Sequence, residues 1–499
     1  MTALIAVPLL LPVFAATASL LFRRRRRAIG AAISIAATAL LLCTNVALVM
    51  QAMRGEVIAY SLGDWPAPYG IVLVLDRLAA LMLILTAVLA LAVIVHAVLT
   101  GLDRKGWHFH PLFHFQLLGV NGAFLTGDLF NLFVFFEVLL IASYGLLLHG
   151  QGARRLTAGV QYVIVNLVGS TIFLIALGML YGVTGTLNMA DVLVRAGDLP
   201  VGDQGLFRAA GLLLLTVFAL KAALLPLHLW LPRAYAGAAP TVAALFAIMT
   251  KVGAYAIVRT GPLVIGAQAG AYMLPAALGT MLLGFAGLLA ARHLRPMAAY
   301  ALIGSTATLL AAIALFEPRA LAAGLYYLPH TTLSAALLFL LADLVVRWRC
   351  VEGDAIVPTP EYPGQRWLGV LFLTAGVALA GLPPLSGFIG KLLILEASLA
   401  SVWAPFIWTL ILGTSLVAVV AFARAGSTLF WKRDLTPATA GTGVRPNFRE
   451  SAPAVFLIVC LVALTLAAGP VTSYMEATSE QVFDVGAYVK AVLVPLEDG

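Results

Sequence analysis

Four charged side chains lie inside long apolar segments of the sequence: Glu137, Lys221, Lys251 and Lys391. A charged group in bilayer hydrocarbon costs at least about 2.5–3.5 kcal/mol, so each should face protein, water or an ion. Away from water, a carboxylate and an ammonium both favour their neutral forms, and a neighbouring charge can reverse that preference. We therefore interpret the four residues as a proton relay. The alternative is a static ion pair between Glu137 and Lys221.

Histidines extend this set, since imidazole gains and loses a proton near neutral pH. His228 lies two residues after Pro226 and close to Trp230, and His330 directly follows Pro329. Either could pass protons between lysines, although each could instead be a hydrogen-bonded core histidine. We expect interfacial positions for the six that lie at or near segment ends: His96, His108, His110, His114, His149 and His293. Hydroxyl groups within the segments could hold water or only pack helices together: Ser143, Ser170, Thr171, Thr250, Ser305, Thr306, Thr308 and Thr332.

Two apolar segments contain helix-breaking residues next to one of the lysines. Pro226 closely follows Lys221, and because proline lacks a backbone donor and clashes with the preceding turn, the helix should kink or break there. The stretch from Gly381 to Lys391 holds two prolines and three glycines. Broken helices in corresponding halves of a transporter point to an ion site at a repeat interface, although prolines in membrane helices can also be purely structural.

The elements that must position these residues are membrane-spanning helices. The chain has 499 residues, of which 62% are hydrophobic and 10% charged, whereas soluble domains carry about 25% charged residues. Many apolar segments exceed the roughly 20 residues that a helix needs to cross a bilayer. We predict an all-α polytopic protein with fourteen spans, at residues 3–22, 28–50, 72–99, 110–127, 129–148, 156–183, 205–225, 240–260, 271–291, 296–316, 323–347, 367–401, 404–430 and 452–470.

Basic residues predict the orientation of these spans. Arg23 to Arg27 follow the first span directly, which is the reverse of a cleavable signal peptide and places the N-terminus outside. With that assignment, 20 of the 30 Lys and Arg residues lie in inside loops and 6 in outside loops, among them Arg259. This bias follows the positive-inside rule and predicts that both termini are outside.

Several other functions are disfavoured by what the sequence lacks. It has no GxxxxGK[ST] or GxGxxG phosphate loop, so nucleotide hydrolysis within the chain is not expected. Cys43, Cys350 and Cys460 form no CxxC pair and have no histidine at metal-ligand spacing, so we expect neither a metal nor any other cofactor. The arginine run orients the first span rather than binding nucleic acid.

Three stretches resemble a known family: Val120–Glu137, Pro226–Phe246 and Met249–Thr260. They are similar to D subunits of Mrp-type multisubunit Na⁺/H⁺ antiporters, which share their fold with the antiporter-like subunits of respiratory complex I. The resemblance implies fourteen helices in two inverted five-helix repeats with broken seventh and twelfth helices. It also implies four regions: N-terminal helices 1–3 (1–109), the first repeat with helices 4–8 (110–260), the second repeat with helices 9–13 (261–431), and a cytoplasmic loop, helix 14 and tail (432–499).

By the same resemblance, Glu137 and Lys221 form a switchable pair, Lys251 is the central relay, and Lys391 is the far end of the proton path. His330 resembles the family's eleventh-helix histidine, and Ser334 stands where a lysine or histidine is often found. The implied function is that of a secondary transporter subunit, not an enzyme, in a bacterial cell membrane. Its partners would be the lipid bilayer, other membrane subunits, H⁺ and Na⁺, and its role would be pH homeostasis.

A second hypothesis keeps the same residues but couples them to electron transfer, as in a proton-pumping subunit of complex I or a membrane-bound hydrogenase. A third, a scaffold that only holds partners, is opposed by the four charges within apolar segments. The Tyr235–Thr241 junction and the Val120–Glu137 stretch favour the antiporter by resemblance.

Overall fold

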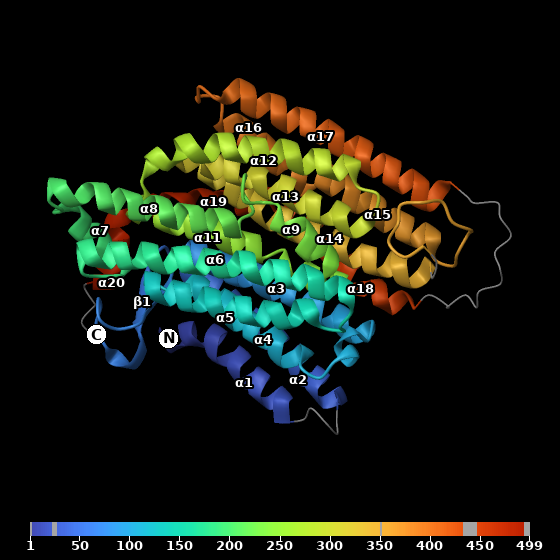
Figure 1. Cartoon of the computed structure of the whole chain (residues 1–499), viewed down its shortest axis with the longest axis horizontal. Helices are drawn as coiled ribbons and strands as arrows, with labels where there is room; N and C mark the ends of the chain where they lie inside the picture. Colours follow the sequence, from blue (N-terminus) through green and yellow to red (C-terminus); the bar gives the residue numbers. More distant parts are fainter. Residues whose placement is uncertain (1, 22–26, 350–351, 433–446, 494–499) are drawn as a thin grey trace.

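The computed structural model describes residues 2–21, 27–349, 352–432 and 447–493. Long helices lie side by side in an elongated bundle (Figure 1). In this described part, twelve helices are long and apolar enough to cross a membrane. Helix α4 (Phe109–Leu125) and the broken pair α15–α16 (Gln365–Ala380 and Ser386–Ala397) occupy the other two predicted spans. The all-helical class and the fourteen-span plan are confirmed.

The unbroken helices are long because their apolar runs contain few interrupting residues. They are α1 (Val7–Leu21), α2 (Arg27–Ala52), α3 (Arg77–Leu99), α5 (Leu129–Leu148), α6 (Ala153–Thr184), α8 (Val201–Lys221), α12 (Gly270–Ala290), α13 (Leu294–Ile313), α14 (Pro318–Arg349), α17 (Ala404–Gly426) and α18 (Ala452–Leu466). Three shorter helices follow the first break: α9 (Trp230–Gly237), α10 (Pro240–Phe246) and α11 (Met249–Thr260). Single-turn 3₁₀ or π segments are η1 (Thr2–Ala6), η2 (Leu62–Asp64), η3 (Leu102–Lys105), η4 (Gly261–Ile265), η5 (Ala267–Ala269), η6 (Ser427–Trp431) and η7 (Phe448–Ser451).

One end of the bundle carries the peripheral elements. Helices α7 (Met189–Gly197), α19 (Ala468–Phe483) and α20 (Val485–Leu493) and strand β1 (Ile58–Ser61) are the main ones. Helix α20 packs on both β1 and α7, and η1 packs on β1, so the first and last described elements lie at the same end (Figure 1). The tail after the fourteenth span is therefore helical and packed, not simply an extension.

The start of the third predicted span is wrong. Residues Val72–Leu75 form strand β2, which pairs antiparallel with β1, and helix α3 begins only at Arg77. The run Val-Leu-Val-Leu suits a strand, and Asp76 then caps the helix by accepting a hydrogen bond from the Ala79 backbone nitrogen. Arg77, which we expected inside the span, is thus its first residue.

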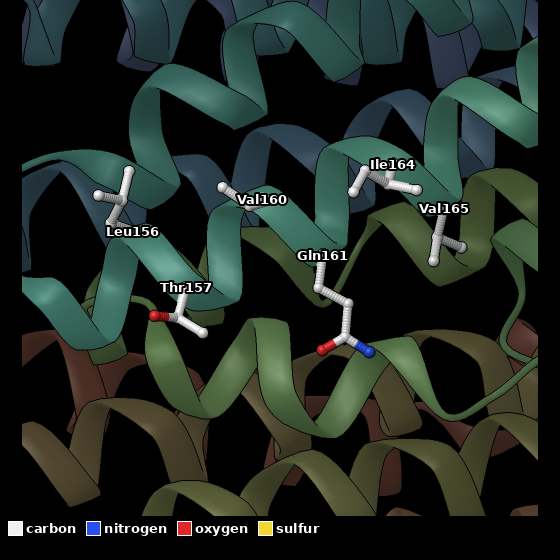
Figure 2. A pocket seen from close by; sticks show the side chains of 6 residues that line it. All are labelled: Leu156, Thr157, Val160, Gln161, Ile164 and Val165. Atoms are coloured by element: carbon white, nitrogen blue, oxygen red, sulfur yellow. The ribbon is translucent and has the colours of Figure 1, made fainter.

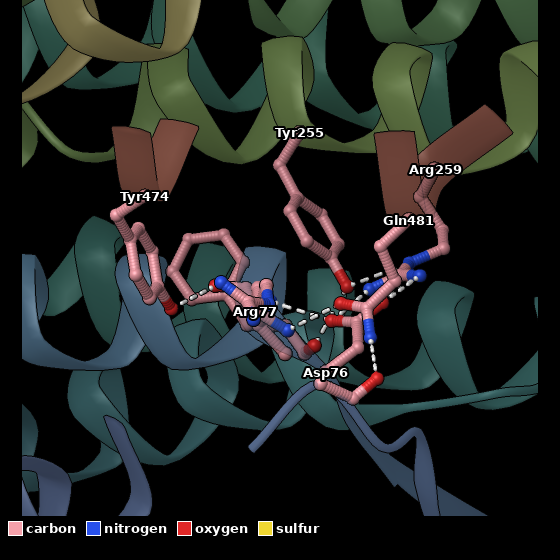
Figure 3. Close-up of polar contacts among 9 residues, drawn as sticks. Asp76, Arg77, Tyr255, Arg259, Tyr474 and Gln481 are labelled. Atoms are coloured by element: carbon pink, nitrogen blue, oxygen red, sulfur yellow. Dashed lines mark hydrogen bonds and ion pairs between the residues drawn. The ribbon is translucent and has the colours of Figure 1, made fainter. Parts of the chain in front are cut away.

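Asp76 also forms a buried ion pair that the sequence did not indicate. Its carboxylate binds Arg259 of α11 at 2.6 and 2.8 Å, so Arg259 is buried within the bundle rather than exposed in a loop. Nearby, the Arg77 backbone nitrogen donates to Gln481 at 2.9 Å and the Arg77 carbonyl accepts from Tyr474 at 2.8 Å (Figure 3). These contacts fasten the C-terminal α19 to the start of α3.

Three of the six histidines that lie at or near span ends are covered by neighbouring helices. His96, His114 and His149 are buried. The His96 Nε2 atom lies 3.1 Å from the Asp343 carboxylate, and the His114 Nε2 atom lies 3.0 Å from the Ser34 hydroxyl. A partner on a neighbouring helix allows a polar ring to be buried near a helix end.

Candidate functional site

The first broken helix holds Lys221 at its last turn. Helix α8 ends at Lys221, as predicted, and the chain runs without regular helix until Trp230. The Leu220 carbonyl at this helix end accepts from the Ala223 backbone nitrogen at 3.2 Å and from the Trp230 indole nitrogen at 3.0 Å. Lys221 is therefore not needed as a cap, and its buried side chain points elsewhere.

Lys221 and Glu137 are connected through helix α6. The Lys221 ammonium donates to the Asn166 side-chain oxygen at 2.9 Å, and the Ser170 hydroxyl donates to the Glu137 carboxylate. Asn166 and Ser170 are four residues apart and so lie on one face of α6. Among the described residues, no salt bridge joins Glu137 directly to Lys221; two neutral side chains stand between them. The ammonium also lies 5.8 Å from the Phe136 ring centroid.

Lys251 occupies the centre of the set. It is the third residue of α11 and fully buried. Its ammonium donates to Thr306 of α13 at 3.0 Å and to Thr250 at 3.3 Å. In the described part of the chain, its hydrogen-bond partners are hydroxyls and none is a carboxylate. This lysine thus lacks a fixed counter-charge, which suits a group that gives up and regains a proton.

A row of hydroxyl groups continues from α13 to α14 and α16. Ser305, next to Thr306, accepts a hydrogen bond from Thr331 at 2.6 Å. His330, next to Thr331, is buried, and its Nδ1 lies 2.9 Å from the Ser386 hydroxyl at the start of α16. The Ser334 hydroxyl donates to the His330 carbonyl at 2.7 Å and so is engaged within its own helix.

Lys391 lies on α16, after the second break. Its buried ammonium donates to the Ala380 carbonyl at 2.9 Å and to Ser415 of α17 at 2.8 Å. Ala380 is the last residue of α15, so Lys391 satisfies an acceptor at the end of the preceding half-helix. The ammonium also lies 5.6 Å from the Phe285 ring centroid.

His228 is the one candidate that the structure does not bring into this row. It lies in the break between α8 and α9, is largely buried, and its Nδ1 has no hydrogen-bond partner. Within the described residues, no hydrogen bond links it to the other five candidates.

Two residues that contact the candidate lysines were not predicted from the sequence. Asn166 and Ser415 contact Lys221 and Lys391 directly. An amide inside the apolar run of α6, four residues before Ser170, was the available signal for Asn166. Ser415 is one hydroxyl among many and gave no comparable signal.

The described part of the chain bears on two other kinds of site, a metal site and a surface groove. No group of three His, Cys, Asp or Glu residues is arranged to hold a metal there. An open groove of about 520 Å³ runs along the outer face of α6. Figure 2 shows its lining side chains, of which Gln161 points towards the neighbouring helix. The Arg233 guanidinium of α9 donates to the Gln161 side-chain oxygen there at 3.5 Å.

Comparison with known proteins identifies the family. The family described as NADH:quinone oxidoreductase/Mrp antiporter, TM, matches residues 126–418. A Rhizobium meliloti protein named as the probable D subunit of a K⁺/H⁺ antiporter is 40% identical, over 96% of this chain and 95% of the relative. A Bacillus subtilis protein named as the D subunit of a Na⁺/H⁺ antiporter is 35% identical, over 98% of this chain and 99% of the relative.

Solved structures agree on the fold. A chain of the Mrp complex from Dietzia superposes with a TM-score of 0.88 at 28% identity, covering 99% of this chain and all of that one. A chain of respiratory complex I from Thermus thermophilus superposes with a TM-score of 0.78 at 24% identity, covering 96% and 99%. This chain belongs to the NADH:quinone oxidoreductase/Mrp antiporter family of membrane proteins.

Proposed function

We propose that this chain is the proton-carrying subunit of a multisubunit cation/proton antiporter in a bacterial cell membrane. The observation that carries the proposal is a set of four charged side chains inside an otherwise apolar bundle, Glu137, Lys221, Lys251 and Lys391, each hydrogen-bonded to neutral polar groups. Buried charges within membrane helices mark ion and proton pathways. As a secondary transporter subunit, the chain would use an ion gradient and perform no covalent chemistry.

Each relay residue has a proposed role that follows from its contacts. Glu137 and Lys221 act as a switch whose two charges communicate through α6, and Lys251 is the central proton carrier. His330 and Ser386 pass the proton on, and Lys391 is the far end of the path. His228 lies in the first break and exchanges protons only when the segment between α8 and α9 changes conformation.

The transported cation is Na⁺ or K⁺, moved with the help of neighbouring membrane subunits. The relatives bear both names: the protein at 40% identity is named for K⁺ and the one at 35% for Na⁺. Both cations therefore belong in the test.

The test is antiport in inside-out membrane vesicles from cells that produce the complete complex. Adding NaCl or KCl to acidified vesicles should release protons, measured with a pH-sensitive dye. The Lys251→Ala complex, present in equal amount, should not. Exchange at the wild-type rate in that variant would overturn the relay.

The alternative is a redox-driven proton pump, since the fold is shared with a chain of complex I. Cation-dependent proton release without an electron donor favours the antiporter, whereas release that requires a donor favours the pump.

We also propose both termini outside and the four-region division at residues 109, 260 and 431. The shared end of η1 and α20 supports placing the two termini on one side. Single cysteines at positions 104 and 433, in a chain without Cys43, Cys350 and Cys460, should react only with reagent on the inside. Position 433 lies outside the described residues. Labelling from the outside would overturn the orientation.

A further inference from the structure

A second pair of ionisable side chains lies in the bundle, outside the row of relay residues. His96 of α3 is fully buried, and its Nε2 lies 3.1 Å from the Asp343 carboxylate of α14. The Asp343 side chain remains 18% exposed. The pair thus joins a side chain that reaches the surface to one inside the bundle.

The pair lies at the end of the bundle opposite the chain termini. Arg259, near the end of α11, binds Asp76 at the start of α3, so α10 and α11 run opposite to α3. His96 is twenty residues beyond Asp76, about 30 Å along the helix. Thr241 is eighteen residues before Arg259, about 27 Å if the helix were continuous. Since α10 packs against both α3 and α14, Thr241 lies at the level of the His96–Asp343 pair.

Aromatic contacts place α10 and α14 at the same level independently. The Tyr235 ring lies 5.6 Å from the Phe246 ring at the end of α10 and 6.3 Å from the Phe339 ring of α14. Asp343 is one helical turn beyond Phe339. The beginning of α10 thus lies near Asp343, on the segment that leads from the first break to Lys251.

Two polar atoms at this level are buried without a partner among the described residues: His96 Nδ1 and the Thr241 hydroxyl oxygen. Buried polar atoms are nearly always hydrogen-bonded to protein or to ordered water. These two atoms therefore leave hydrogen-bonding capacity for ordered water on α3 and α10, two helices that pack against each other.

We propose that His96, Asp343 and Thr241 form the port through which Lys251 exchanges protons with water at the end of the bundle opposite the chain termini. A proton binds at the Asp343–His96 pair and moves by way of water at Thr241 along α10 to the Lys251 amine. The proposal rests on the proposed antiport function. Arg155 of α6 interacts electrostatically with Asp343. Arg347, one helical turn beyond Asp343 on α14, is paired with Glu450 at 3.2 Å.

Asp343→Asn tests the port because it keeps an acceptor for His96 while removing the titrating carboxylate. In vesicles with equal amounts of assembled complex, we expect the antiport rate to fall at least about tenfold and its pH profile to shift. Asp343→Glu should restore most of the rate. His114→Gln is the matched control: it changes another buried histidine, bonded to Ser34 away from α10, and should keep the wild-type profile.

A wild-type rate and pH profile in the assembled Asp343→Asn complex would overturn the port. If that variant does not assemble, Thr241→Val decides, since it only exchanges a hydroxyl for a methyl group: a slowed, shifted exchange supports the port, and an unchanged profile overturns it. The wild-type complex in the same vesicles separates the two proposals. Absence of exchange there overturns the antiport function, whereas exchange that survives in the variants overturns only the port.

Discussion

The two broken helices place a lysine in similar electrostatic settings but give it different partners. Lys221 is the last residue of α8, and the Lys391 ammonium reaches the last carbonyl of α15. Both ammonium groups thus lie near the C-terminus of a half-helix, whose partial negative charge favours a cation. At the first break, however, the Leu220 carbonyl accepts from Ala223 and Trp230, whereas at the second break the Ala380 carbonyl accepts from Lys391 itself.

From this difference we propose that Lys221 acts as a switch and Lys391 as an anchor. Lys221 is free to bind Asn166 and, through α6, to respond to the charge of Glu137. Lys391 has a backbone carbonyl and Ser415 as partners, and no acidic side chain among its hydrogen bonds to the described residues. Proton loss from Lys221 would leave the helix end capped, whereas proton loss from Lys391 weakens the cap of α15. The two lysines should therefore differ in how transport and stability respond to substitution.

The largest effect is expected on transport when Lys221, at the first break, or Lys251 is replaced. Lys221→Ala or Lys251→Ala should abolish antiport while the complex assembles normally, because the relay loses a proton-accepting group in a low-dielectric path. Antiport in vesicles, normalised to assembled complex, is the measurement. Lys490→Ala, on the exposed side of α20, is the control and should leave exchange unchanged. Wild-type exchange in either relay variant would contradict the assignment.

The second prediction concerns Glu137, whose charge the proposed Lys221 switch would sense. Glu137→Gln should abolish most proton movement in complex that assembles normally, since the carboxylate that favours the Lys221 ammonium is gone. Glu137→Asp keeps the charge but shortens its reach to Ser170, so partial activity with a shifted pH dependence is expected. Near-normal turnover per assembled Glu137→Gln complex would refute the switch. Loss of the complex itself would instead favour a static structural role.

The helix breaks and the charged residues could be predicted from the sequence, whereas their contact partners could not. The breaks after Lys221 and near Gly381 could be predicted, because proline and glycine act locally on the helix that contains them. The charged candidates were equally visible, since each interrupts an apolar run. The exact partners were not, because they depend on how distant helices rotate against each other: Asn166 is 55 residues from Lys221, and Asp76 is 183 residues from Arg259.

Buried histidines illustrate the same limit. His96 lies only three residues before the end of α3, which suggested an interfacial position. Its burial is due to Asp343, 247 residues away, which supplies a hydrogen bond inside the bundle. Local hydropathy describes the depth of a residue along its own helix, whereas burial depends on which helix covers it.

The third prediction tests the anchor at the second break. Lys391→Met keeps an unbranched apolar stem but leaves the Ala380 carbonyl without its partner, which should destabilise the fold by about 1–3 kcal/mol. We expect a lower melting temperature of the purified complex together with loss of antiport. Lys221→Met is the matched comparison and should lose antiport with a smaller change in stability, because Trp230 still caps α8. Equal stability losses in the two variants would remove the distinction between switch and anchor.

The smallest expected effect is at the cap that leaves Lys221 free. Trp230→Phe removes the indole N–H that binds the Leu220 carbonyl but keeps an aromatic ring beside Tyr162, whose ring centroid lies 5.5 Å from that of Trp230. A lost hydrogen bond of this kind costs about 1 kcal/mol, so the melting temperature should fall slightly. Most of the antiport should remain, since the Lys221–Asn166 contact is not touched. If Trp230→Phe instead abolishes antiport as Lys221→Ala does, we would infer that Lys221 turns back to cap α8 when the indole is absent. A lysine would then cap the half-helix at both breaks, and the distinction between Lys221 and Lys391 would be lost.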